Sequence, residues 1–151
     1  MKRIILCTDG EKHSQKAEYL SIEFAKKFNV ELVCLYVVDA YPKKFTDEIY
    51  AINREECRRY LDKALTEEGL KAFEKFMEKT KGFDIKVKTK LRYGLPYEEI
   101  MKEIREGDYD LLIMGLKRYK SLLDRIRSFY LPKKVFENSP IPVLFAVSDD
   151  E

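Results

Sequence analysis

Two strand ends mark the places in this sequence where chemistry could occur. Residues 111–114 form a continuous apolar run that stops at Gly115, and residues 4–7 form a similar run that leads into Thr8 and Asp9. Parallel strands of an open sheet bind ligands beyond their carboxyl ends, where the connecting loops begin. We therefore expect a ligand site between these two ends. Asp9 has an alternative role in plain turn chemistry, because Asp-Gly is a common turn pair whose carboxylate accepts hydrogen bonds from nearby amides.

A basic connector follows Gly115. Residues 117–134 carry seven basic side chains and one acid, a local formal charge of +6 in a chain whose total is +2. Arginine binds phosphate through two parallel hydrogen bonds, so Arg118 and Arg127 are candidates for anion contacts. A run of charge is more often a solvated face, however, and apolar residues at helical spacing in this stretch indicate packing over the sheet. The aromatic side chains belong to that packing stripe, so a nucleic-acid partner is not expected.

Patterns for catalysis and metal binding are weak. His13 is the single histidine and has no carboxylate or cysteine partner fixed by the sequence, so neither a catalytic triad nor a metal site is expected. The cysteines are widely spaced and form no C-x-x-C pair, and those inside expected strands act as small apolar side chains. No Walker loop and no G-x-G-x-x-G motif is present. We expect a binding or regulatory module rather than an efficient enzyme.

Alternating strands and helices must position these residues. Strands are expected at residues 2–8, 30–38, 83–91, 111–114 and 143–147, of which 83–91 alternates lysines with apolar residues as an edge strand does. Helices are expected from Ser14 to Asn29, over about 49–80, from Pro96 to Gly107 and over 132–138. Residues 66–69 interrupt the second helix, as a kink or as a boundary capped by Thr66. This alternation predicts an α/β fold: a single doubly wound, five-stranded parallel sheet with helices on both faces.

Length and composition limit the class of protein. The chain has 151 residues, 45% of them apolar, which suits one globular domain over residues 1–151. No apolar run approaches the roughly 18 residues that a membrane span needs. The first apolar run is too short for a signal peptide and is interrupted by Asp9, so we expect a cytoplasmic protein. The charged fraction of 37%, rich in lysine and glutamate, and the single glutamine are typical of a thermophile.

The order of these pieces resembles the universal stress protein family. The matching segments are residues 4–10 with the Asp-Gly turn, 13–17, 35–39, 93–96 with its Gly-x-Pro turn, 110–115 and 139–144. The resemblance implies a Rossmann-like, adenine nucleotide alpha hydrolase-like domain with strand order 3-2-1-4-5. It also implies that Asp9 lies against a bound nucleotide, with Val37 and Met114 beside the adenine base.

The phosphate-binding motif of that family is broken here. ATP-binding members continue from the fourth strand with Gly-x2-Gly-x9-Gly-(Ser/Thr), whose glycines let backbone amides approach phosphate oxygens. Gly115 matches the first glycine, but the second position is Arg118, the third is Ser128 and the hydroxyl position is Phe129. If the positions of this motif are counted backward from Pro140 instead, no glycine falls on them either. Two interpretations stay open: the cradle is lost, or cations such as Arg118 and Arg127 replace its amides.

These observations favour a binding or regulatory module in the stress response, with ATP binding weakened or lost. We expect it to act through protein contacts and as a homodimer, paired through the apolar last strand at 143–147. The alternative is a nucleotide or anion sensor that uses Asp9, Gly115 and the connector 117–127. No cofactor is expected under the first reading, and ATP with Mg²⁺ under the second. No membrane association is expected under either.

Overall fold

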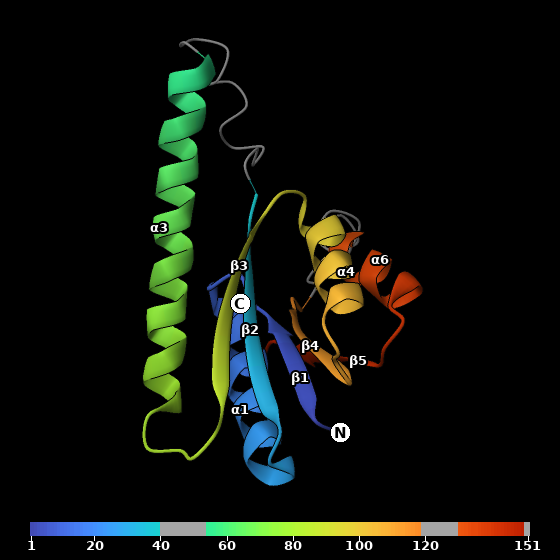
Figure 1. The fold of residues 1–151 in the computed structure, drawn as a ribbon. Helices are drawn as coiled ribbons and strands as arrows, with labels where there is room; N and C mark the ends of the chain where they lie inside the picture. Colours follow the sequence, from blue (N-terminus) through green and yellow to red (C-terminus); the bar gives the residue numbers. More distant parts are fainter. Residues whose placement is uncertain (40–53, 119–129, 150–151) are drawn as a thin grey trace.

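The computed structural model describes residues 1–39, 54–118 and 130–149. Five parallel strands form one sheet in the order β3-β2-β1-β4-β5, with helices between them. This confirms the predicted α/β fold class and the strand order (Figure 1). The strands are β1 (Arg3–Cys7), β2 (Glu31–Val38), β3 (Val87–Tyr93), β4 (Leu111–Leu116) and β5 (Val143–Val147).

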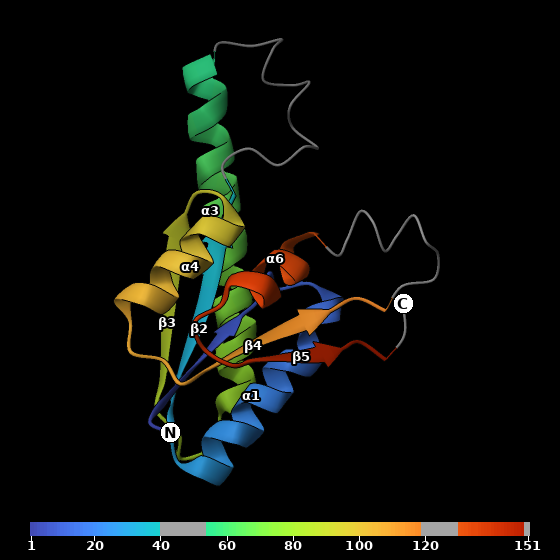
Figure 2. The same cartoon turned by 90° about the vertical axis from the view of Figure 1, so that its right-hand side faces the viewer.

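Helices cover both faces of the sheet, as Figures 1 and 2 show. The 3₁₀ turn η1 leads into α1, and Asn29 ends α1 in the left-handed conformation expected of a C-cap. Helices α1 and α3 pack on one face and helices α4 and α6 on the other, which gives two apolar clusters. The helical elements are η1 (Lys12–Ser14), α1 (Gln15–Phe28), α3 (Arg54–Thr80), α4 (Pro96–Glu106) and α6 (Tyr130–Asn138).

The central strands are buried on both sides, which explains their continuous apolar sequences. In β1, Ile4 and Leu6 belong to the cluster under α1 and α3, while Ile5 and Cys7 belong to the cluster under α4. Side chains of neighbouring strand residues point to opposite faces of a sheet, so two covered faces require apolar residues at every position.

Helix α3 runs without interruption, so the expected break at 66–69 is wrong. The Thr66 hydroxyl donates a hydrogen bond to the Asp62 carbonyl within the helix, and it does not cap a new one. Gly69 has a packing reason instead, because a Cβ there would stand 2.9 Å from Tyr36 and from Leu91. The first turns of α3 extend past the carboxyl ends of the strands (Figure 1).

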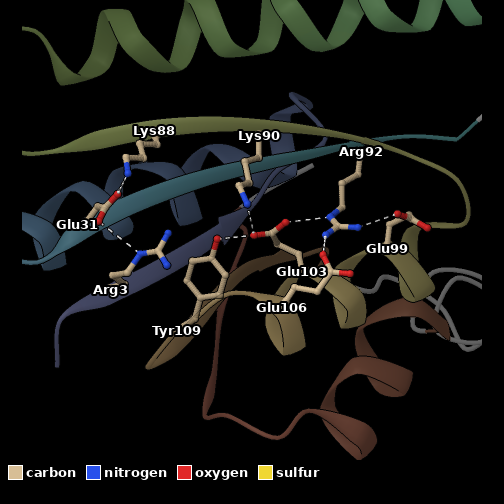
Figure 3. Close-up of polar contacts among 9 residues, drawn as sticks. All are labelled: Arg3, Glu31, Lys88, Lys90, Arg92, Glu99, Glu103, Glu106 and Tyr109. Carbon is tan, nitrogen blue, oxygen red and sulfur yellow. Dashed lines mark hydrogen bonds and ion pairs between the residues drawn. The ribbon is translucent and has the colours of Figure 1, made fainter.

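Strand β3 lies at the edge of the sheet, as predicted, but it begins at Val87 and ends at Tyr93. Its cations pair with carboxylates on the α4 side of the sheet (Figure 3). The centre of this charge cluster is Glu103, 1% exposed, which accepts hydrogen bonds from Lys90, Arg92 and the Tyr109 hydroxyl. Charged pairs therefore take the place of apolar packing between β3 and α4.

Within the ranges that the structure describes, no helix is both long enough and apolar enough to cross a bilayer.

Candidate functional site

A cavity of about 500 Å³ lies at the carboxyl ends of the central strands. The sheet register places Cys7, the last residue of β1, between Leu35 of β2 and Met114 of β4, and both neighbouring strands continue past this level to Val38 and Leu116. The side chains of Cys7, Leu35 and Met114 form part of the cavity wall, and Ile100 of α4 and Leu131 of α6 also line it. This volume is within the range of pockets for small organic ligands.

Five of the residues singled out from the sequence meet in this cavity: Thr8, Asp9, Val37, Met114 and Gly115. They come from the ends of β1, β2 and β4, which are far apart in the chain and adjacent in the sheet. The predicted meeting of two strand ends is therefore present in the geometry. Whether these residues hold a nucleotide stays a prediction.

The basic candidates are placed differently. Arg118 is not among the residues that line the cavity, because its Nε donates to the Ser148 carbonyl at 3.1 Å and its amide donates to the Ser148 hydroxyl at 3.2 Å. Lys117, one residue earlier, lines the cavity. Arg127 and Ser128 lie outside the described residues, so the structure does not place them.

The Asp9 carboxylate organises the turn after β1. One of its oxygens accepts hydrogen bonds from the Glu11 amide at 2.9 Å and the Ser14 hydroxyl at 2.8 Å. The other oxygen lies 3.0 Å from Nε2 of His13. Burial raises the pKa of Asp9, but these hydrogen bonds outweigh it and hold the pKa below the usual value. The hydrogen bond to Asp9, together with the charge of that carboxylate, raises the pKa of His13. Asp9 therefore stabilises the turn, as expected of an Asp-Gly pair, and it also lies on the cavity wall.

Gly115 has a packing role that is independent of any phosphate. A Cβ at this position would stand 2.7 Å from the backbone oxygen of His13 and 3.0 Å from the Cα of Ser14. Glycine therefore lets the end of β4 approach the η1 turn. The match to the first glycine of the family motif does not by itself indicate a phosphate cradle.

Charged side chains of both signs line the cavity. Asp9 and Glu11 follow β1, Asp39 follows β2, and Lys117 follows β4. Burial raises the pKa of Asp39 and raises that of the Cys7 thiol. A buried thiol of this kind is neutral and a poor nucleophile.

Asp9, Glu11 and His13 bring one possible metal-ligating atom each within 4.8 Å of one another. Their hydrogen bonds and ion pairs to one another already account for this arrangement, so it is not taken as a metal site. The Ser14 hydroxyl donates to Asp9 and not to His13. The Thr8 hydroxyl, which also lines the cavity, donates to the carboxylate of Glu18.

The sequence reasoning missed Lys117 and the role of His13. Lys117 was one of seven cations in the connector, and nothing in its spacing separated it from Arg118. His13 was considered only as a metal ligand or triad member. Its position four residues after Asp9 was the available signal, because that spacing across a turn and the start of a helix brings the two side chains together.

Comparison with known proteins gives the family. The model of the universal stress protein family matches residues 1–146. The chain belongs to the universal stress protein family. Universal stress protein MJ0531 of Methanocaldococcus jannaschii is 30% identical over 143 residues, which cover 95% of this chain and 80% of that protein.

Solved structures agree on the fold. A universal stress protein family member from Arabidopsis thaliana, solved with AMP bound, superposes with a TM-score of 0.68 at 15% identity, covering 99% of this chain and 93% of that one. A universal stress protein in complex with cAMP gives a TM-score of 0.58 at 18% identity, covering 98% of both chains. At such identities these two matches establish the Rossmann-like fold alone.

Proposed function

We propose that this universal stress protein is a regulatory module that binds a small adenine nucleotide, of the size of AMP, without a cradle for a triphosphate. The observation that carries the proposal is the cavity of about 500 Å³ that brings Asp9, Val37, Met114 and Lys117 together. Val37 and Met114 offer an apolar wall for a base, Asp9 can accept hydrogen bonds from ribose hydroxyls, and Lys117 can pair with one phosphate group.

The charge of the cavity favours a short phosphate chain. Three carboxylates line it, against the cation Lys117 and the imidazole of His13. Each added phosphate brings more negative charge close to these carboxylates, which costs Coulomb energy in a partly dry site. The sequence also has no glycine after Gly115, so backbone amides have less access to further phosphate oxygens.

The relatives support the choice of ligand class. The Arabidopsis thaliana protein was solved with AMP and another family member with cAMP. Both nucleotides carry one phosphate group. We propose the same class of ligand for this chain, with no metal cofactor and no catalytic turnover, and with a cytoplasmic location and a role in the stress response.

Calorimetric titration with AMP and with cAMP tests the proposal. We expect saturable binding of one nucleotide per chain. A Val37→Phe variant, which fills the wall assigned to the base, should lose the binding while keeping the fold. A matched control is Val87→Phe, at a partly buried valine of the edge strand β3 that does not line the cavity. If neither nucleotide binds the wild-type protein, the proposal is wrong.

A second part of the proposal concerns assembly. Strand β5 is an edge of the sheet, and its run Val143–Val147 is entirely apolar. An uncovered apolar edge strand favours pairing with another strand. We propose a homodimer through β5. Light scattering should give twice the chain mass for the wild type, and Val147→Lys should shift it toward the monomer. A monomeric wild type at high concentration would contradict this part.

A further inference from the structure

A buried carboxylate lies directly behind the turn that carries Asp9. Glu18 of α1 is 4% exposed, although the helix positions around it that face the sheet are apolar or small. One of its oxygens accepts a hydrogen bond from the Thr8 hydroxyl at 2.7 Å. The other forms an ion pair with Nζ of Lys79, near the carboxyl end of α3. Glu18 therefore joins β1, α1 and α3 at one buried point.

The hydrogen bonds around Glu18 have a defined direction. A carboxylate paired with a lysine can only accept, so the single hydroxyl proton of Thr8 points to Glu18. The lone pairs of that hydroxyl are then free to accept the Gly10 amide, which lies 3.1 Å away. A continuous chain thus runs from Lys79 through Glu18 and Thr8 to the backbone of Gly10. Asp9 is held between the two residues that this chain fixes.

Helix α3 also contacts the same turn directly. Gly10 has a φ of 75°, and a Cβ there would stand 2.9 Å from the Cβ of Ala72. A second cavity of about 430 Å³ lies between this turn and α3, lined in part by Lys71 and Lys75. The turn is thus a wall between two cavities. On its α3 side the turn is supported at Gly10 by Ala72, and beside this contact it borders the second cavity.

The Glu18–Lys79 pair is poorly explained by its contribution to the free energy of folding alone. Removing two charges from water is costly, and replacing a buried ion pair by apolar residues of similar size is often neutral or stabilising. Apolar residues at both positions would also suit the cluster around Ala17, Ile22 and Phe76. An ion pair differs from such packing in one respect: it fixes the position and direction of the Thr8 hydroxyl.

We propose that Glu18 is a positioning residue of the nucleotide site, held by Lys79, which fixes the turn 8–11 through the Thr8 hydroxyl and the Gly10 amide. The ligand side of this inference rests on the proposed nucleotide binding. The positioning itself does not, because the order of the turn can be measured in the free protein.

The double variant Glu18→Leu/Lys79→Met tests the role without leaving a buried charge unpaired. The control is Glu23→Leu/Lys26→Met, which removes an exposed pair on the same helix whose atoms lie 3.4 Å apart. Hydrogen exchange of the Glu11 amide, measured by NMR, is the first readout. This amide is bound to Asp9 and touches none of the substituted residues. AMP affinity by calorimetry is the second readout, and the melting temperature is the third.

The proposal predicts that the double variant melts within a few degrees of the wild type, exchanges the Glu11 amide at least about ten-fold faster, and binds AMP about five- to ten-fold more weakly. The control should match the wild type in all three. A folded double variant with unchanged Glu11 exchange overturns the proposal. If AMP does not bind the wild type, the proposed function fails, while the exchange rate still decides the positioning role.

A second pair of variants covers the case in which the double variant does not fold. Thr8→Val keeps the shape of the side chain and removes the hydroxyl, whereas Thr8→Ser keeps the hydroxyl. We expect faster Glu11 exchange and weaker AMP binding in Thr8→Val, with both restored in Thr8→Ser. Equal behaviour of the two variants would contradict the relay through the hydroxyl.

Discussion

The carbonyl oxygen of His13 lies so close to Gly115 that a Cβ on the glycine would stand 2.7 Å away from it. The obstacle is backbone, which cannot rotate away as a side chain can. The end of β4 and the η1 turn therefore form one packed unit, whose residues line the candidate site together with Asp9 and Met114.

Gly115→Ala should therefore destabilise the protein even without a ligand. We expect a loss of about 1–3 kcal/mol in the free energy of unfolding, measured by urea denaturation, because the added methyl group overpacks the contact. Lys117→Ala, two residues along and without this contact, is the control. A Gly115→Ala variant as stable as the wild type would show that the close approach is not required.

Substitutions of Lys117 and of Arg118 should change nucleotide affinity to different extents. Lys117 lines the cavity, whereas the Arg118 side chain is bound to Ser148. We expect Lys117→Ala to weaken AMP binding about five-fold, since a partly exposed ion pair to phosphate contributes roughly 1 kcal/mol. Arg118→Ala should leave affinity within about two-fold. Calorimetry decides between them, and the reverse order of effects would contradict the placement of the two cations.

Glu103 should be the most costly charge to remove from the cluster between β3 and α4. Glu103→Gln loses the ionic contacts to Lys90 and Arg92 and leaves their hydrogen bonds weakened in a buried place. We expect a loss of about 2–4 kcal/mol in the free energy of unfolding. Glu106→Gln is the matched control, because Glu106 also binds Arg92 but is 66% exposed, and should cost under about 1 kcal/mol. Equal losses would contradict the account.

The Asp9–His13 pair should make stability depend on pH. The folded-state pKa of His13 is raised above its ordinary 6.5, so its contribution is complete below that value and is lost as pH rises through the folded pKa. The folded-state pKa of Asp9 is below its ordinary 3.8, so its contribution is present above that value and is lost as pH falls through the folded pKa. The pair is therefore strongest between these two ordinary values.

A His13→Gln variant reports this dependence. The difference in unfolding free energy between wild type and variant should be larger at about pH 5.5 than at about pH 9, by less than about 1 kcal/mol because Asp9 is half exposed. Urea denaturation at the two pH values measures it. A difference that stays constant, or grows toward high pH, would show that the two side chains do not form a charged pair.

Local patterns predicted most of the fold from the sequence. Residues 4–7 and 111–114 are apolar at every position, and only strands covered on both faces require this. The break at 66–69 was wrong, because Gly69 indicates flexibility in sequence but here allows close approach to Tyr36. Sequence alone does not tell these two uses of glycine apart.

The site was predicted in position but not in its supporting contacts. Asp9 and Gly115 follow buried strands, so their meeting could be inferred from the rule for strand ends. The direction of Arg118 depends on Ser148, 30 residues away, and the pairing of Glu18 depends on Lys79, 61 residues away. Contacts at such separations follow from the assembled fold and leave no local signal.

The ratio of AMP affinity to ATP affinity tests the central claim most directly. The measurement is a pair of calorimetric titrations of the wild-type protein, one with AMP and one with ATP and Mg²⁺, at the same pH and ionic strength. Three carboxylates line the cavity, and the proposed function assigns it no triphosphate cradle, so we expect ATP to bind no more tightly than AMP. ATP binding more than about ten-fold tighter than AMP, equivalent to roughly 1.4 kcal/mol of added phosphate contacts, would contradict it.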